Sequence, residues 1–99
     1  MAEKIIVKPD PDLIDLIPGY LRNRRTDVVE LKKAFAAKDF PHIRSIGHSI
    51  KGSGAGYGFD GLTLLGAELE TAARDNSEAA VLAKIAELEN YLLNVEIAS

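Results

Sequence analysis

The chain has no cysteine and no tryptophan, and only one methionine. Without cysteine, a disulfide scaffold, thiol catalysis and cysteine-based zinc sites are all excluded. It also lacks an apolar run approaching the roughly 20 residues that cross a bilayer. The first residues carry an acid at Glu3 and too short an apolar stretch for a signal peptide, so we expect a cytoplasmic protein without a membrane partner.

Excess positive charge is absent as well. The 99 residues contain 12 Lys and Arg against 15 Asp and Glu, for a net charge of −3. Residues 1–51 hold ten of the basic and seven of the acidic residues, whereas residues 52–99 hold two and eight. The basic residues that fall close together are Arg22, Arg24, Arg25, Lys32 and Lys33. Acidic residues interleave with them, which favours a solvated helix face over an anion-binding patch, and no basic stripe is present to bind a nucleic acid.

A chain of 99 residues makes one small domain, which must bury enough apolar surface to stay folded. Apolar residues recur at helical spacing along most of it, and Pro18 should kink or interrupt the first helix. The candidate helix caps are Asp10, Thr26, Asp39, Asp60 and Ser77. Short connections between such helices predict an all-α fold, an antiparallel four-helix bundle with an additional short or kinked N-terminal helix.

The only extended segment is residues 4–7, and one segment alone cannot form a sheet. We therefore expect residues 1–9 to form an N-terminal arm, ordered only if Ile5, Ile6 and Val7 pack on the bundle. Residues 10–97 are expected to form the helical domain.

Glycine is concentrated in one region, because seven of the eight glycines lie between residues 47 and 66. Glycine weakens regular structure, so this cluster needs a reason. Gly47 lies toward the apolar side of its helix, and Gly66 lies on the same side as Leu62 and Leu69. We expect these two glycines to let two helices approach closely. Gly58 suits the position just after a helix, where a left-handed residue ends it.

His48 is the more informative of the two histidines. On a helical wheel of about 100° per residue, Ile43 and Ile50 mark the apolar face, and His48 lies about 140° from Ile43. His48 therefore faces solvent, with Lys51 on one flank and Gly52 on the other. A glycine costs about 0.8–1.0 kcal/mol relative to alanine inside a helix, but Gly52 leaves room for a bulky group beside the imidazole.

An exposed imidazole with an adjacent cation and a cleared approach suits a phosphoryl group, because neutral imidazole is a good nucleophile at pH 7. Other chemistry fits less well. His42 and His48 do not share a helix face as i, i+4 metal ligands do. Residues 52–58 lack the preceding strand and the following lysine of a phosphate-binding loop. Ser49 lies on a different side of the helix, so a Ser–His nucleophile pair is not expected.

With these residues in view, the sequence resembles the histidine-containing phosphotransfer (HPt) domain family. The family signature is H-x-x-K-G-[SA], then small residues, a hydrophobic residue and a glycine. It is matched here by His48, Lys51, Gly52, Ser53, Gly54-Ala55-Gly56 and Tyr57-Gly58. The spacing of the flanking helices also agrees, at Tyr20, Leu31, Phe35, Asp39 and Phe40 before the histidine and at Leu62, Leu65, Leu69 and Glu70 after it. Glycine at positions 54 and 56 and tyrosine at 57 depart from the family pattern and leave the end of the histidine helix open.

The resemblance implies that His48 is phosphorylated on Nε2, that Lys51 steadies the phosphoryl group and that Gly52 leaves space for it. It implies that the phosphoryl group comes from a receiver-domain aspartyl phosphate, or from a histidine kinase upstream, and passes to another receiver aspartate. The Mg²⁺ of the reaction would belong to the receiver, and this chain would need no cofactor of its own.

We also expect Arg44, Ser49 and Ala55 to contribute to partner docking, and the chain to be a monomer without kinase activity, since no nucleotide-binding element is present. The alternative is a helical docking module for receiver or kinase domains that works without phosphorylation. Such a module would bind a receiver without moving a phosphoryl group.

Overall fold

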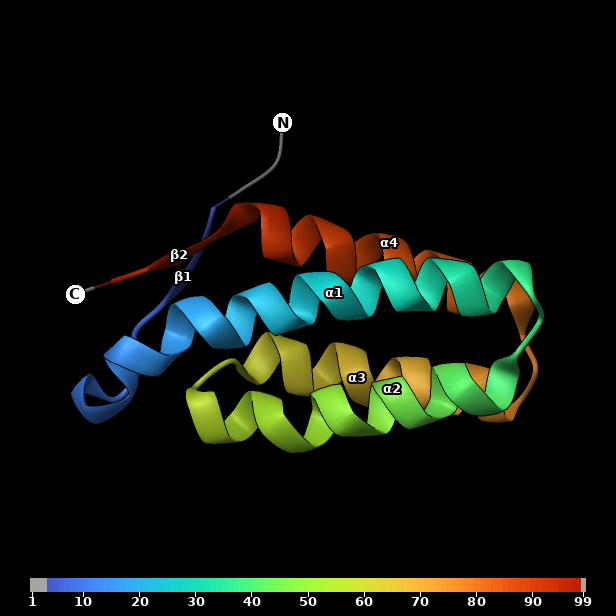
Figure 1. Cartoon of the computed structure of the whole chain (residues 1–99), viewed down its shortest axis with the longest axis horizontal. Helices are drawn as coiled ribbons and strands as arrows, with labels where there is room; N and C mark the ends of the chain where they lie inside the picture. Colours follow the sequence, from blue (N-terminus) through green and yellow to red (C-terminus); the bar gives the residue numbers. More distant parts are fainter. Residues whose placement is uncertain (1–3, 99) are drawn as a thin grey trace.

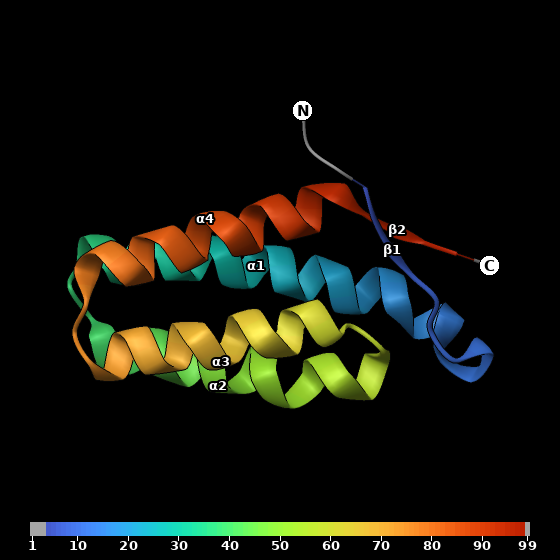
Figure 2. The ribbon, with the colours of Figure 1, turned by 180° about the vertical axis from the view of Figure 1, so that it is seen from behind.

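A computed structural model describes residues 4–98 of the chain. In chain order its elements are β1 (Ile5–Val7), the 3₁₀ helix η1 (Pro11–Leu16), α1 (Ile17–Ala36), α2 (Phe40–Gly54), the 3₁₀ helix η2 (Ala55–Tyr57), α3 (Asp60–Arg74), α4 (Glu78–Asn94) and β2 (Val95–Ile97). The four α-helices lie along the long axis, with α1 and α4 in one layer and α2 and α3 in the other (Figures 1 and 2). Short turns join them, so consecutive helices run in opposite directions. The expected all-α class is confirmed.

The N-terminal part of the bundle differs from the expected helix boundaries. Asp10 caps η1 by accepting a hydrogen bond from the backbone N–H of Asp12 at 2.9 Å. Pro18 lies in the first turn of α1, where the missing N–H is tolerated, and the interruption is the change from 3₁₀ to α-helix just before it. The expected cap at Thr26 is wrong. Its hydroxyl donates to the carbonyl oxygen of Arg22 at 3.2 Å, one turn back inside a continuous helix.

The expectation that the extended N-terminal segment has no partner is also wrong. β1 pairs in parallel with β2, in a register that sets Ile5 opposite Val95 and Val7 opposite Ile97. The backbone N–H of Ala98 donates to the carbonyl oxygen of Val7 at 2.8 Å and extends the pairing. Val95 continues the apolar spacing of the last helix, which hides the change to a strand, and its partner comes from the other end of the chain.

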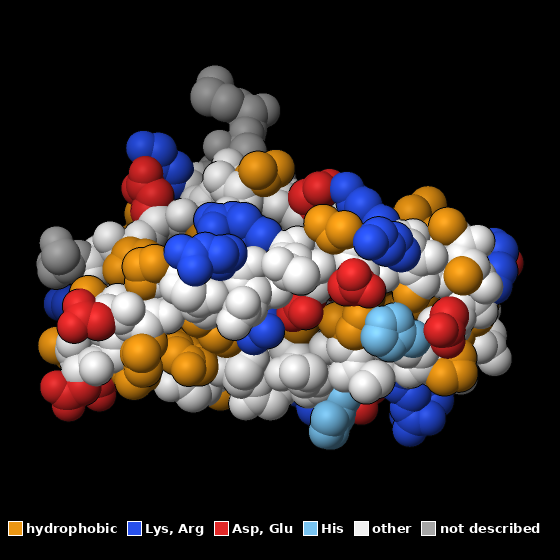
Figure 3. All heavy atoms as spheres, in the orientation of Figure 1, with side chains coloured by type: hydrophobic (Ala, Val, Ile, Leu, Met, Phe, Trp, Pro, Cys, Tyr) orange, Lys and Arg blue, Asp and Glu red, His pale blue; other side chains and the backbone are white. Residues whose placement is uncertain are grey.

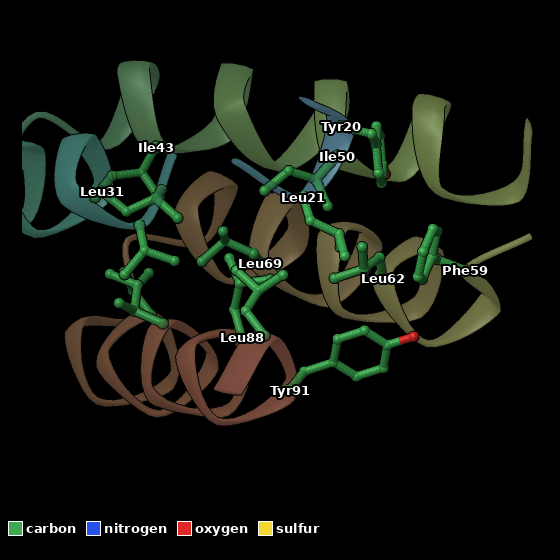
Figure 4. Packing of buried hydrophobic residues seen from close by; sticks show 14 of the residues in the cluster. Tyr20, Leu21, Leu31, Ile43, Ile50, Phe59, Leu62, Leu69, Leu88 and Tyr91 are labelled. Carbon is green, nitrogen blue, oxygen red and sulfur yellow. The ribbon is translucent and has the colours of Figure 1, made fainter. Parts of the chain in front are cut away.

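One apolar core fills the space between the two helix layers (Figure 4). Its largest fully buried side chains are Leu31, Ile43, Ile50, Phe59, Leu62, Leu69, Val81 and Leu88. Each such side chain stabilises the fold by roughly 1.5–3 kcal/mol relative to exposure. At one end, the Tyr20 ring of α1 stacks on Tyr57 and Phe59, with centroids 4.3 and 5.5 Å away. This stacking ties α1 to the turn that follows α2.

The remaining helix starts confirm the expected cap at Asp39 and differ from expectation at Ser77 and Asp60. Asp39 caps α2, because its Oδ1 accepts a hydrogen bond from the backbone N–H of His42 at 3.3 Å. Ser77 occupies the capping position of α4 but makes no side-chain capping bond. At α3 the capping position belongs to Phe59, and Asp60 is the first helical residue. The buried ring of Phe59 occupies the capping position. Asp60 therefore lies in the first turn, where the positive end of the helix dipole favours its carboxylate.

Candidate functional site

Two glycines bring α2 and α3 unusually close together. A Cβ atom added to Gly47 would lie 2.9 Å from the backbone nitrogen of Glu70, and one added to Gly66 would lie 2.5 Å from that of Lys51. Both distances are shorter than real Cβ contacts, so only glycine permits this separation. The packing role expected for Gly47 and Gly66 is therefore confirmed.

The close approach places Glu70 of α3 between two side chains of α2. Its Oε2 lies 2.9 Å from Nδ1 of His48, and its Oε1 accepts a hydrogen bond from Nζ of Lys51 at 2.7 Å. The Glu70 side chain is 21% exposed, whereas the His48 side chain is 68% exposed. One carboxylate thus holds both the imidazole and the ammonium group at the surface of the α2–α3 layer.

The Glu70 contact determines which imidazole nitrogen of His48 is open. An ionised carboxylate can only accept hydrogen bonds, so Nδ1 carries the proton and donates it to Glu70. Among residues 4–98, this is the one side-chain hydrogen bond of the imidazole. Nε2 therefore holds the free lone pair, and that nitrogen is the nucleophilic atom of the exposed ring.

The electrostatics keep Glu70 in its ionised form. The hydrogen bond from Lys51 lowers the pKa of Glu70 below its usual value of 4.5, against the opposing effect of partial desolvation, and the hydrogen bond with His48 lowers it further. At neutral pH the carboxylate can therefore accept from both partners at once.

Gly52 leaves the surface beside His48 open. A Cβ atom added there would meet no heavy atom within 4 Å, other than its neighbours in the chain and helix. Lys51 is 38% exposed, so its ammonium group borders the same open region while Glu70 holds it. Side chains three or four residues apart on a helix are neighbours, which places His48, Lys51 and Gly52 together at one surface.

The three expected docking residues are exposed around this cluster. Arg44 lies one helical turn before His48 and lines a surface hollow together with Arg74 of α3. Ser49 follows His48 directly, and Ala55 begins η2. Their role in docking stays a prediction.

Ser53 serves the fold and does not contact the imidazole. Its hydroxyl lies 3.1 Å from the hydroxyl of Tyr20 and accepts a hydrogen bond from Nη1 of Arg24 at 3.0 Å. The guanidinium of Arg24 is itself held by Asp27 at 2.7 Å and lies 4.7 Å from the centre of the Tyr20 ring. This network fastens the C-terminal end of α2 to α1.

Three glycines at and beyond the end of the histidine helix, which the sequence left open, have separate structural roles. Helix α2 ends at Gly54, where an added Cβ would lie 2.6 Å from Oγ1 of Thr63 on α3. After η2, Gly58 adopts a left-handed conformation with φ of 85°, as its expected position requires. At Gly61 an added Cβ would lie 2.5 Å from the Tyr91 ring of α4. Close packing thus accounts for Gly54 and Gly61, to which the sequence analysis assigned no individual role.

Residues 4–98 contain no group of three His, Asp or Glu side chains placed to hold a metal ion. None of the helices in this part of the chain is both long and apolar enough to cross a membrane.

Glu70 is the candidate residue that the sequence prediction missed. It entered only as part of the helical context after the motif. A signal was present in the spacing, because Gly66 and Glu70 are one helical turn apart, as are Gly47 and Lys51. In the antiparallel pair each glycine lies opposite the turn that follows the other, Gly47 against Glu70 and Gly66 against Lys51. The side chains of Glu70 and Lys51 meet across this close approach.

Comparison with known proteins adds one finding. The protein-family model described as the Hpt domain matches residues 15–98. No curated protein and no solved structure gave a match. The matched residues include all four α-helices and every member of the cluster formed by His48, Lys51, Gly52 and Glu70.

Proposed function

The chain belongs to the Hpt domain family, whose members serve histidine phosphotransfer in two-component phosphorelays, and we propose that His48 is the residue that carries the phosphoryl group. The observation that supports this assignment most directly is the geometry of its ring. His48 is exposed, its Nδ1 is engaged by Glu70 so that Nε2 is left free, and Gly52, one helical turn away, leaves the neighbouring surface open.

The proposed reaction moves a phosphoryl group from a receiver aspartate to His48 and on to a second receiver aspartate. The lone pair of Nε2 attacks the phosphorus of the aspartyl phosphate. The N–P bond forms as the bond between phosphorus and the aspartate oxygen breaks, and the aspartate leaves as a carboxylate. The proton on Nδ1 stays in place because Glu70 accepts it. In the reverse direction a receiver carboxylate attacks phosphorus and imidazole leaves neutral.

Three neighbours of His48 assist this reaction in different ways. Glu70 holds the imidazole in one tautomer and stabilises the positive charge that the ring acquires when the N–P bond forms. Lys51 borders the open region, where its ammonium group can neutralise phosphoryl oxygens. Gly52 supplies the space that the phosphoryl group and the receiver surface occupy. Positioning and charge stabilisation are enough, since the receiver brings the Mg²⁺.

The partner surface and the setting are part of the same proposal. Hpt domains are phosphocarrier modules that work with receiver domains and histidine kinases. For this chain we propose docking through Arg44, Ser49 and Ala55, and no kinase activity of its own. A monomeric state, a cytoplasmic location and a domain boundary near residue 10 stay predictions.

The test is transfer from a receiver domain phosphorylated on its aspartate. We expect label to move to the chain in a form stable in alkali and labile in acid, as phosphohistidine is. His48→Gln should abolish transfer, and His42→Gln, which changes the other exposed histidine of the same helix, should leave it unchanged. Transfer that survives His48→Gln would refute the assignment. Receiver binding without any transfer to the unaltered chain would support the docking module in its place.

A further inference from the structure

The outer seam between α1 and α4 is a surface that phosphotransfer at His48 does not use. Two hollows of about 210 and 180 Å³ lie between α1 and α4, and a third of about 510 Å³ continues the seam between α1, η1 and Ile97 of β2. In order along α1 from its N-terminal end, the hollows are those of 510, 210 and 180 Å³. The first and second share Arg25 in their walls, and the second and third share Lys32 and Glu89. The three hollows therefore lie in line along one seam, called here the α1–α4 groove, which runs from Ile17 to Phe35 of α1. The ion pair of Lys32 with Glu89 crosses the groove between the second and third hollows.

Exposed apolar side chains are concentrated in this groove. Val29 of α1 and Leu82 and Leu93 of α4 line it and are 52%, 54% and 78% exposed. They are half of the six large hydrophobic side chains that stand exposed among the described residues. Single exposed apolar residues are ordinary, but several along one groove are typical of a surface that binds a partner.

Some of the charged side chains that border the groove have an ion-pair partner among the described residues and others have none there. Within residues 4–98, the ion pairs of α1 are Arg24 with Asp27, Lys33 with Glu30 and Lys32 with Glu89. Arg22 and Arg25 are in none of these pairs, although both line the groove. Figure 3 shows Lys and Arg side chains gathered over α1, with hydrophobic side chains beside them. The groove thus offers unpaired positive charge next to an apolar floor.

The length of the groove indicates the shape of its occupant. The 19 residues of α1 from Ile17 to Phe35 span roughly 27 Å at about 1.5 Å per residue. A helix of about 18 residues covers that distance, and its apolar stripe repeats at the spacing that a groove between two helices accepts.

From these observations we propose that the α1–α4 groove binds an acidic amphipathic helix of another protein. The apolar stripe of that helix packs against Val29, Leu82 and Leu93, and its carboxylates pair with Arg22 and Arg25. A second copy of this chain is a poorer occupant, because its groove presents no free carboxylate to Arg22 and Arg25: the one carboxylate among the lining residues, Glu89, is already paired with Lys32.

Binding in the groove is compatible with phosphotransfer. The groove belongs to the α1 and α4 layer, whereas His48 and Glu70 belong to α2 and α3 in the other layer (Figures 1 and 2). A helix bound there leaves the imidazole accessible to a receiver. The proposal is thus independent of the assignment of His48.

The experiment selects binders to the full chain from a display library of 18-residue amphipathic helices, randomised at their apolar and charged positions. We expect enrichment of helices whose apolar stripe is flanked by Asp and Glu. A selected peptide is then synthesised with a fluorophore, and its Kd is measured by anisotropy. Replacing its carboxylates by amides should weaken binding at least tenfold.

Variants of the chain locate the site. Arg22→Glu with Arg25→Glu, and separately Leu93→Ser, should each weaken peptide binding at least tenfold. Leu64→Ser, which alters an equally exposed leucine on α3, and His48→Gln should leave the Kd unchanged. The proposal is overturned if acidic helices are not enriched or if the groove and control variants bind alike. It is equally overturned if Arg22 and Arg25 instead mediate self-association or binding to vesicles containing anionic phospholipid.

Discussion

Substitutions of Gly52 should raise the stability of the fold and slow phosphotransfer, so this one position distinguishes the two effects. It lies within the last turn of α2, and a Cβ atom added there would meet no heavy atom within 4 Å. Gly52→Ala therefore introduces no clash and removes the flexibility of glycine from a helix. The expected gain in the free energy of unfolding is about 0.5–1 kcal/mol, somewhat below the full interior value because the helix ends nearby. For a domain of this size the melting temperature should rise by roughly 2–8 °C.

The longer variant Gly52→Gln should keep most of this gain, since glutamine is also a good helix former. Its side chain, however, extends into the open surface beside His48, where the phosphoryl group and the receiver must approach. We expect transfer from a phosphorylated receiver to slow at least tenfold while the melting temperature stays at or above that of the unaltered chain.

The assays are thermal unfolding by circular dichroism and single-turnover transfer from one labelled receiver. Gly19→Ala is the matched control, because Gly19 lies in α1, also has no atom within 4 Å of an added Cβ, and is remote in sequence from the motif. It should not slow transfer. A lower melting temperature for Gly52→Ala, or unaltered transfer by Gly52→Gln, would refute the reasoning.

The other predictions concern the contact between α2 and α3. Gly66→Ala places a Cβ 2.5 Å from the backbone nitrogen of Lys51 and should lower the free energy of unfolding in urea by about 1–3 kcal/mol; unchanged stability would show that the helices separate freely. Glu70→Gln should slow transfer to His48, since an amide cannot stabilise the charged ring as a carboxylate does. Because Lys51 lowers the pKa of Glu70, the folded chain gains stability above the usual carboxyl pKa of 4.5 and loses it as pH falls below that value. The stability difference between the unaltered chain and Glu70→Gln should therefore shrink from pH 7 to pH 3, and a constant difference would contradict it.

Local sequence signals predicted the parts of the structure that depend on one helix at a time. The apolar face of α2, the cap at Asp39 and the exposure of His48 all follow from helical periodicity near the residue itself. The predicted helix starts were wrong where other interactions outweighed the local preference of a residue for the capping position. Thr26 is a good capping residue, but its hydroxyl bonds back into α1, and the helix continues through it. Asp60 is displaced from the capping position by the buried ring of Phe59.

The sequence by itself therefore determined the helical class, the orientation of His48 on its helix and the motif that surrounds it. Only the tertiary structure decided that Glu70 holds His48 and Lys51, and that β1 pairs with β2. The reason is physical. Periodicity specifies where a side chain points relative to its own axis, whereas the residue that stands opposite depends on how closely and in which register two helices pack. For α2 and α3, the missing side chains at Gly47 and Gly66 set both.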